Sequence, residues 1–425
     1  MKFEELNLLK NIQHALNDEG YENPTPIQEQ AIPIIIDGSD LVGCAQTGTG
    51  KTAAFALPLI HNLHRIVGAN TKTKRIRALI ITPTRELALQ IGESFDTYGK
   101  YTNIRQLTIF GGVNQVSQTD QLRKGVDVLI ATPGRLLDLH KQGFVNLDHL
   151  HTLVLDEADQ MLDMGFINDV KKIIKLTPDN RQTLLFSATM PTAIRELADT
   201  FLTNPKYVSV APVSSTAEKV KQQVYFVDKA DKRKLLYHLI RNQNLNNVLV
   251  FTRTKHGADN VVKALKKHGV ESGAIHGDKS QSSRVRVLES FKNKEIPVLV
   301  ATDIAARGID IESLPYVINF DLPNIPETYV HRIGRTGRAG NSGLAISFCG
   351  KDEKTYLKDI EKLIRIPIKV IEDHPYPYPV EDAAAKANQK PDLRNKPKGN
   401  GAGNAKKDNN SRKSEASKKN KRRWY

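Results

Sequence analysis

The sequence predicts an α/β fold of two tandem doubly wound domains, each with a parallel sheet covered by helices on both faces. Short, fully apolar, β-branched runs are separated by about 20–40 residues of helix and loop, the pattern of strands buried on both faces. The runs VLIAT at 128–132 and VLVAT at 298–302 lie at comparable places in the two halves. This correspondence indicates a duplicated architecture, and a chain of 425 residues suffices for two or three domains.

Each expected strand ends in a polar loop. In the first half, strands are expected within 40–44, 78–85, 106–112, 127–135, 152–159 and 183–189. In the second half, they are expected within 247–255, 272–278, 297–303, 316–321 and 344–348. Because ligands of such sheets bind beyond the carboxyl ends of the strands, we expect the functional residues in the loops that follow.

We expect an N-terminal domain over residues 1–205, a linker over 206–218, a C-terminal domain over 219–375 and a tail over 376–425. The linker prediction rests on the stretch from Asn204 to Ala217, which contains prolines and serines and has no helical stripe. Each of the two domains is long enough to bury its own core.

The tail is expected to be basic and disordered. From Glu381 to Tyr425 it carries 14 Lys and Arg against 5 Asp and Glu, with almost no apolar residues before Trp424. Such a segment cannot bury enough surface to offset its ordering entropy. Its charge favours polyanions through counterion release, although a solubilising tail with no specific role stays open.

Membrane-spanning and disulfide-built classes are excluded by the sequence. The longest apolar runs, such as the one at 53–60, are far shorter than the roughly 18 residues that span a bilayer. Glu4 and Glu5 stand where a signal peptide needs apolar residues, and Cys44 and Cys349 cannot supply a disulfide framework or a zinc site. We therefore expect a cytoplasmic protein without a membrane partner; its oligomeric state is not indicated.

The sharpest single motif is AQTGTGKT at 45–52, which follows a short strand and precedes an apolar-rich helix. This is the context of a phosphate-binding loop, in which glycines let backbone N–H groups face the phosphates. Lys51 would reach the β- and γ-phosphates, and the Thr52 hydroxyl would bind Mg²⁺. The expected nucleotide-binding residues of this loop are Gln46, Thr47, Gly48, Thr49, Gly50, Lys51 and Thr52.

A nucleotide site also needs a carboxylate at the end of another strand, and DEAD at 156–159 supplies it. Asp156 is placed to hold Mg²⁺, partly through water, and Glu157 to orient and deprotonate the attacking water. An acidic turn that only caps a helix is the structural alternative.

The second half has no phosphate-binding loop, but it contains HRIGRTGR at 331–338. Arg332, Arg335 and Arg338 recur at every third residue, which also suits a basic helix face paired with acids. An arginine supplied by a second domain can stabilise the γ-phosphate during its transfer. The sequence therefore predicts an ATPase that is complete only when its two domains close.

Eight motifs resemble those of DEAD-box ATP-dependent RNA helicases in order and spacing, over about residues 1–370. They are GYENPTPIQ (20–28), AQTGTGKT (45–52), PTRELALQ (83–90), TPGR (132–135), DEAD (156–159), SAT (187–189), ATDIAARGID (301–310) and HRIGRTGR (331–338). Stretches such as ATPGRLLDL and LVLDEADQMLDMGF resemble the bacterial RhlE subgroup. The resemblance implies two RecA-like domains.

For the nucleotide, the resemblance implies that Gln28 reads the adenine edge, with Tyr21 stacked on the base and Phe3 supporting from upstream. Asp310 would meet the ribose, and Arg335 and Arg338 the γ-phosphate; with Lys51, Asp156 and Glu157, these two arginines are the expected catalytic residues. ATP and Mg²⁺ are the expected cofactors. Coupling between the domains is expected from Asp159, Ser187, Thr189 and His331, and we expect no zinc.

For RNA, the resemblance and the strand-end positions imply a sequence-independent contact with one strand. Backbone N–H groups, hydroxyls and arginines suit phosphates and ribose hydroxyls, and no set of stacking aromatics accompanies them. The expected RNA-binding residues are Arg85, Gly111, Gly112, Thr132, Gly134, Arg135, Arg284 and Thr302.

The function so implied is an RNA-dependent ATPase that locally unwinds short RNA duplexes or remodels RNA–protein complexes, with ATP hydrolysis resetting a two-domain clamp. Two alternatives stay open: a helicase that is not selective for RNA, and an ATP-switched RNA clamp or annealing protein with little unwinding. Ribosomal and mRNA-decay complexes are both compatible partners.

Overall fold

The computed structural model describes residues 1–46, 48–67, 75–210, 220–306, 311, 314–337 and 343–377. Some predictions fall outside these residues: Thr47, Asp310, Arg338, the part of the linker after residue 210 up to residue 218, and the tail from residue 378 onward. In the part of the chain that is described, no helix combines the length and apolar character needed to cross a membrane.

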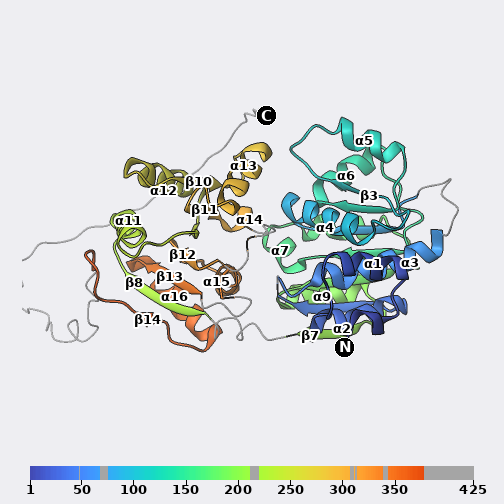
Figure 1. Ribbon diagram of the computed structural model, residues 1–425, viewed down its shortest axis with the longest axis horizontal. Helices are drawn as coiled ribbons and strands as arrows, with labels where there is room; N and C mark the ends of the chain where they lie inside the picture. The colour runs from blue at the N-terminus through green and yellow to red at the C-terminus, as the bar shows by residue number, and fades with distance from the viewer. Residues whose placement is uncertain are drawn as a thin grey trace, which may run out of the picture. The chain divides into compact units, whose positions relative to one another are not determined.

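Seven parallel strands form the first sheet, in the order β3-β4-β2-β5-β6-β1-β7. Figure 1 labels its two edge strands, β3 and β7. The strands are β1 (Leu41–Ala45), β2 (Ala78–Ile81), β3 (Gln106–Ile109), β4 (Val128–Ala131), β5 (Thr152–Leu155), β6 (Gln182–Ser187) and β7 (Lys206–Val210). Adjacent residues of a strand enter opposite cores: Leu184 and Phe186 of β6 belong to one hydrophobic cluster and Leu185 to the other. This alternation is the two-residue period of a sheet buried on both faces.

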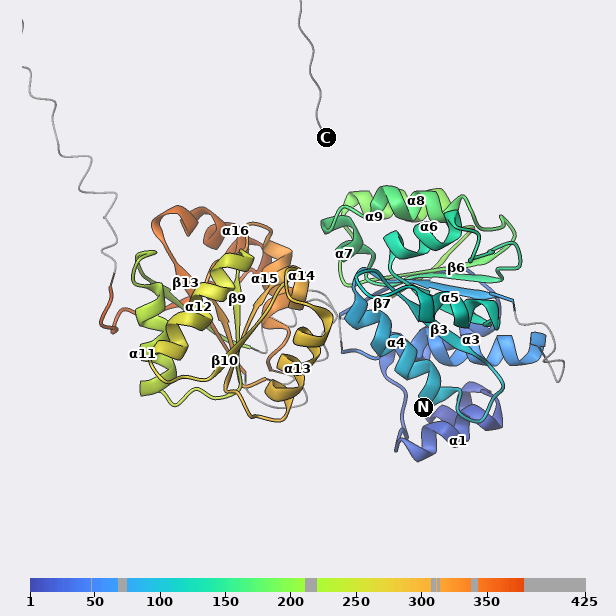
Figure 2. The same cartoon turned by 90° about the horizontal axis from the view of Figure 1, so that it is seen from above.

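Two groups of helices cover these faces, as Figure 2 shows. On one face lie η1 (Phe3–Leu6), α1 (Lys10–Asp18), α2 (Pro26–Ile36), α3 (Lys51–Val67) and α4 (Arg85–Tyr98). On the other lie α5 (Val116–Arg123), α6 (Pro133–Lys141), α7 (Ala158–Asp163), α8 (Ile167–Ile174) and α9 (Thr192–Phe201). Side-chain caps favour several of these starts; at α4, for example, the Thr84 hydroxyl accepts a hydrogen bond from the Leu87 N–H.

The second sheet repeats the plan with seven parallel strands in the order β10-β11-β9-β12-β13-β8-β14. They are β8 (Lys221–Phe226), β9 (Val248–Thr252), β10 (Ser272–Ile275), β11 (Val298–Thr302), β12 (Tyr316–Asn319), β13 (Leu344–Cys349) and β14 (Lys369–Val370). The accompanying helices are α11 (Lys232–Asn242), α12 (Lys255–Lys267), α13 (Gln281–Lys292), α14 (Asp303–Ala306), α15 (Pro326–Ile333), η2 (Lys351–Glu353) and α16 (Lys354–Ile364). The predicted pair of doubly wound domains is therefore confirmed.

The expected linker needs a correction at its start. Residues 206–210 form β7, which pairs with β1 in the first sheet, Leu41 opposite Lys206. The reason is that β7 lies at the sheet edge: Tyr207 is exposed and only Val208 is buried, so the segment lacks the apolar run that marks an interior strand. Strands β8 and β14, which the sequence did not predict, also lie at or beside a sheet edge and carry polar residues.

Candidate functional site

The loop between β1 and α3 has the geometry that a phosphate-binding loop requires. Gly48 and Gly50 adopt the left-handed backbone conformation, with φ of 79° and 90°. At Gly50 a Cβ would also collide with the amide of Gln28, so any other residue there would be strained. Lys51 begins α3, and its side chain is buried while its Nζ makes no hydrogen bond to the residues that the structure describes. A buried ammonium with open donor positions fits a phosphate.

Gln28 fastens the start of α2 to this loop. Its Oε1 accepts a hydrogen bond from the Thr25 N–H (2.9 Å), and its Nε2 donates to the Gly50 carbonyl (3.1 Å). The Thr25 hydroxyl donates to the Thr49 carbonyl (2.7 Å). An amide group has four hydrogen-bonding positions, so Gln28 keeps capacity for a ligand.

The two aromatic residues expected near the base differ in burial. Phe3 belongs to the core of the first domain, and its N–H donates to the Glu22 carbonyl (3.3 Å). Tyr21 is 44% exposed, which leaves its ring accessible for stacking.

Asp156 and Glu157 follow β5 directly and are both buried. Burial raises the pKa of Asp156 and raises the pKa of Glu157 to about 7; the neighbouring carboxylate of Asp156 adds to the rise at Glu157, while the charges of Lys51 and Arg335 oppose it. Glu157 also has a left-handed backbone (φ 54°, ψ 52°), which costs about 1–2 kcal/mol in a residue with a Cβ. Strain and a perturbed pKa in one buried acid are typical of a catalytic position.

Asp159 joins this strand end to that of β6. Its N–H donates to the Ser187 hydroxyl (3.2 Å), which in turn donates to the Thr189 carbonyl (2.7 Å). His331 of α15 places its Nε2 3.9 Å from the Asp159 carboxylate. The four residues expected to couple the domains are thus brought together.

Arg332 and Arg335, the two arginines of the 331–338 segment that the structure describes, have different surroundings. Arg332 is buried and fully engaged: it pairs twice with Asp303 (2.5 and 2.8 Å) and donates to the Asn319 side chain (3.0 Å). It therefore fits the alternative of a basic residue paired with acids. Arg335 is buried too, but its charge acts on Glu157, so it fits the catalytic alternative.

Most of the residues expected to bind RNA surround one cavity of about 360 Å³. Its lining includes six of them: Arg85, Gly111, Thr132, Gly134, Arg135 and Arg284. The Arg85 guanidinium lies against Gly112 and fills the space that a Cβ at this residue would need. Thr302, at the end of β11, is not among the lining residues.

Sequence reasoning missed an acid inside this cavity. Glu86 pairs with Arg284 (Nη2 to Oε1, 2.9 Å) and accepts a hydrogen bond from the Gln281 amide (3.0 Å). Glu86 lies in the motif PTRELALQ, and Arg284 was already an expected RNA-binding residue. The missed signal was therefore the opposite charge of these two residues. Met164, Phe166 and Ile304 add an apolar side that no motif indicated.

Comparison with known families decides the identity. The model of the DEAD/DEAH box helicase domain matches residues 25–197, and that of the helicase conserved C-terminal domain matches residues 231–340. The chain belongs to the DEAD/DEAH box helicase family.

Curated relatives and solved structures agree with this membership. The chain is 46% identical over 368 residues to the ATP-dependent RNA helicase CshA of Limosilactobacillus reuteri, covering 86% of this chain and 72% of the relative. It is 44% identical over 365 residues to the ATP-dependent RNA helicase RhlB of Pseudomonas syringae pv. tomato, covering 85% and 92%. Among structures, it is similar to S. cerevisiae Dbp5 bound to RNA and ADP BeF3 (TM-score 0.77, 32% identity, 87% of this chain and 95% of that chain).

The predictions of an ATP-dependent RNA helicase and of RecA-like domains are therefore confirmed at the level of the family. The roles assigned to single residues stay predictions. Within the described residues, no group of three or more His, Cys, Asp or Glu could hold a metal.

Proposed function

We propose that the chain is an RNA-stimulated ATPase that separates short RNA duplexes locally or remodels RNA–protein complexes. ATP hydrolysis resets a clamp that its two domains form on one RNA strand. The observation that carries this proposal is the electrostatic environment of Glu157. Lys51, from the phosphate-binding loop of the first domain, and Arg335, from the turn after α15 in the second domain, both act on its carboxylate. A catalytic acid that is influenced by both domains suits an ATPase whose turnover depends on the two domains coming together.

In this mechanism the buried Lys51 ammonium binds the phosphates, and Thr52 and Asp156 are the residues that would hold Mg²⁺. When bound, Mg²⁺ neutralises charge on the phosphate oxygens. Glu157 orients the attacking water and accepts its proton. A base with a pKa of about 7 is well matched to this task near neutral pH. Arg335 and Arg338 stabilise the negative charge of the transferring phosphoryl group.

Selection of ATP is assigned to the amide of Gln28, with Tyr21 against the base, Phe3 behind it and Asp310 at the ribose. A wrong base would leave buried polar groups unpaired, which costs more than a lost favourable contact. The same amide also donates a hydrogen bond to the Gly50 carbonyl. A base that binds to Gln28 would therefore also affect the conformation of the phosphate-binding loop.

RNA is assigned to the 360 Å³ cavity and its rim. Its arginines and the backbone of Gly111 and Gly134 suit phosphate and ribose, and they provide no edge-specific readout of bases. We therefore propose binding without sequence preference. Thr302 would take part at the rim, in a closed state of the clamp.

Several finer assignments are proposed with this function. An N-terminal domain up to about Val210 and a C-terminal domain up to residue 375 are supported by the two sheets. The RhlE-like subgroup rests on the stretches at 131–139 and 153–166, since the relatives named above carry other subgroup names. A cytoplasmic location and partners in ribosomal or mRNA-decay complexes stay predictions as well.

The test is steady-state ATP hydrolysis without nucleic acid, with single-stranded RNA and with DNA of the same sequence, using Lys51→Ala as the blank. We expect strong stimulation by RNA alone, and displacement of a short RNA strand in the same buffer. Glu157→Gln should bind ATP and lose turnover. Equal stimulation by DNA would show a helicase that is not selective for RNA, and no stimulation would favour the ATP-switched clamp. Normal turnover of Glu157→Gln would contradict the assignment of the base.

A further inference from the structure

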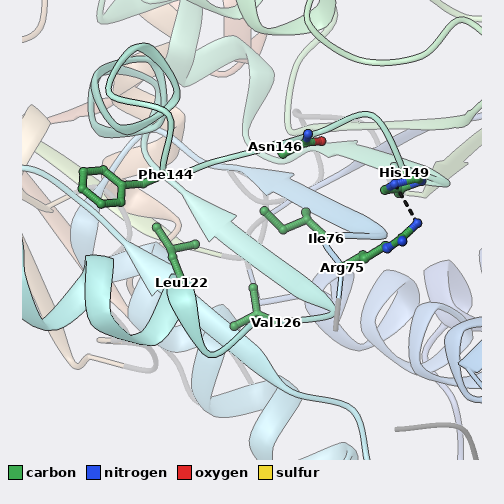
Figure 3. A pocket seen from close by; sticks show the side chains of 8 residues that line it. Arg75, Ile76, Leu122, Val126, Phe144, Asn146 and His149 are labelled. Atoms are coloured by element: carbon green, nitrogen blue, oxygen red, sulfur yellow. Dashed lines mark hydrogen bonds between the residues drawn. The ribbon is translucent and has the colours of Figure 1, made fainter. Parts of the chain in front are cut away.

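A second cavity lies in the first domain, away from the strand ends that carry the ATP-site motifs. Its volume is about 290 Å³. Figure 3 shows the side chains that line it. Arg75 and Ile76 stand just before β2, and Val126 just before β4, so the cavity opens at the amino-terminal edge of the sheet. The phosphate-binding loop and the DEAD residues follow carboxyl ends of strands, which meet at the opposite edge. The cavity therefore has no part in the mechanism proposed above.

The floor of this cavity is apolar and aliphatic. Ile76, Leu122 and Val126 form it, each with less than a tenth of its surface exposed, and half-buried Phe144 closes one side. Arg123 covers the Phe144 ring at 5.2 Å from its centroid, which leaves the ring less accessible. A concave aliphatic surface of this size takes up an apolar side chain.

The rim supplies a fixed cationic group. Arg75 lies with its Nη1 2.8 Å from Nε2 of His149. The dashed line in Figure 3 marks this hydrogen bond. Because a guanidinium can only donate, His149 must accept at Nε2 and carry its proton on Nδ1. Arg75 is exposed, and no carboxylate of the described residues is within ion-pair distance of it. Its remaining N–H groups are therefore held in place and available to a carboxylate.

We propose that this cavity binds an extended peptide segment of a partner protein, in which a large apolar side chain enters between Ile76, Leu122 and Val126 and a neighbouring carboxylate pairs with Arg75. The positive charge of Arg75 favours an acidic segment as the ligand. The acids near the cavity already have other partners: Asp120 pairs with Arg123 (2.9 Å), and Asp148 accepts a hydrogen bond from Asn146 (2.9 Å). RNA fits less well, because the aliphatic floor has no open aromatic face for a base.

Occupancy of this cavity leaves the other edge of the sheet accessible. A partner held here would tether the enzyme while ATP and RNA bind at the carboxyl ends of the strands. The peptide should therefore bind with the same affinity in the presence and absence of nucleotide. This inference does not depend on the proposed function.

The test is methyl NMR on the full chain, labelled at Ile, Leu and Val methyl groups, with the blocked peptide acetyl-Gly-Phe-Glu-Gly-amide as the probe. We expect saturable shifts of the Ile76, Leu122 and Val126 methyl signals at millimolar peptide. Replacing Glu by Gln in the peptide, or Arg75→Gln in the protein, should weaken binding about fivefold, the upper range for an exposed charge pair. Arg105→Gln, an exposed arginine before β3, is the matched control and should bind normally.

Three results would overturn the proposal. The first is an absence of saturable shifts at these methyl groups up to about 10 mM peptide, since weaker binding would not be specific. The second is equal binding of the Glu and Gln peptides, which would remove the role of Arg75. The third is a stronger shift of the same signals by a hexaadenylate RNA, which would assign the cavity to nucleic acid. An unchanged melting temperature of Arg75→Gln would show that the variant is folded.

Discussion

Oδ2 of Asp159 accepts two hydrogen bonds from Thr189, one from its N–H (2.9 Å) and one from its hydroxyl (2.8 Å). Burial acts to raise the pKa of Asp159, but the charges of His331 and Lys51 and these two bonds outweigh it and hold the pKa below its usual range. The ionised carboxylate thus fixes the end of β6 against the start of α7. Any change at the ATP site that moves Asp159 must also move Thr189.

Thr189→Val removes the hydroxyl bond and keeps the shape of the side chain. We expect a loss of about 1.5–3 kcal/mol in the free energy of unfolding at neutral pH, the range for a hydrogen bond to a charged group. Because the pKa of Asp159 is lowered by folding, its contribution is present above the unfolded pKa and is lost as pH falls through the folded value. The difference between wild type and variant should therefore shrink toward acid pH.

Urea unfolding of both proteins across this pH range measures the effect. Thr200→Val is the matched control: its exposed hydroxyl donates to a backbone carbonyl within α9, and its removal should change little. A difference for Thr189→Val that stays constant down to acid pH would contradict the link to Asp159.

Glu157→Gln should stabilise the nucleotide-free protein at alkaline pH. Folding raises the pKa of Glu157 from 4.5 to about 7, so the folded state binds more protons between these values and stability falls as pH rises through them. Once Glu157 is fully ionised, the free energy of unfolding is lower by about 3 kcal/mol, because each pKa unit corresponds to about 1.36 kcal/mol. Glutamine has no charge and avoids this cost.

Thermal unfolding without nucleotide or Mg²⁺ at about pH 8 and pH 5 measures this effect. We expect a higher melting temperature for Glu157→Gln at the alkaline pH, and a much smaller difference at the acid pH. Glu93→Gln, an exposed acid of α4, is the control and should show no such dependence. A variant that is less stable than wild type at alkaline pH would show that the ionised carboxylate is satisfied in the folded state.

The interior strands could be predicted from sequence because both of their faces are buried. Runs such as that of β9, with every residue buried, have one interpretation. The edge strand β7 could not be predicted, since exposed residues interrupt its pattern and Pro205 precedes it. A strand can be predicted from its own residues only where both of its faces are buried and therefore require apolar side chains.

The site was predictable in its motifs but not in its pairings. Arg332 and Arg335 are three residues apart and look alike in sequence. Only the fold brings Asp303 and Asn319 to Arg332 and leaves Arg335 acting on Glu157. The contact of Glu86 with Gln281 spans 195 residues, and no local pattern encodes such a distance.

Removal of residues 381–425 should raise the RNA concentration needed for half-maximal ATPase and leave the plateau nearly unchanged. The reason is that the 14 basic residues of this segment add counterion release and no group of the ATP site. A variant with these lysines and arginines replaced by glutamine separates charge from length and should behave like the truncation. A collapsed plateau in folded protein would show that the tail takes part in catalysis.

Gly112→Ala should weaken RNA binding specifically, through Arg85. Gly112 has a φ of +77°, and a Cβ there would occupy the space of the Arg85 guanidinium, which must then move away. Gly143→Ala is a close control, because Gly143 has a φ of +78° and a Cβ there would meet nothing within 4 Å. Both variants carry the same backbone strain, about 1–2 kcal/mol, and only the first displaces an arginine.

RNA affinity measured over a range of salt concentrations separates the two effects. If Arg85 contacts a phosphate, Gly112→Ala should weaken binding of all sequences equally and reduce the slope of log affinity against log salt by about one. Gly143→Ala should lose similar stability and keep both affinity and slope. Since strain is common to the pair, an equal loss of affinity in both variants would mean that strain is responsible and that Arg85 does not bind the RNA backbone.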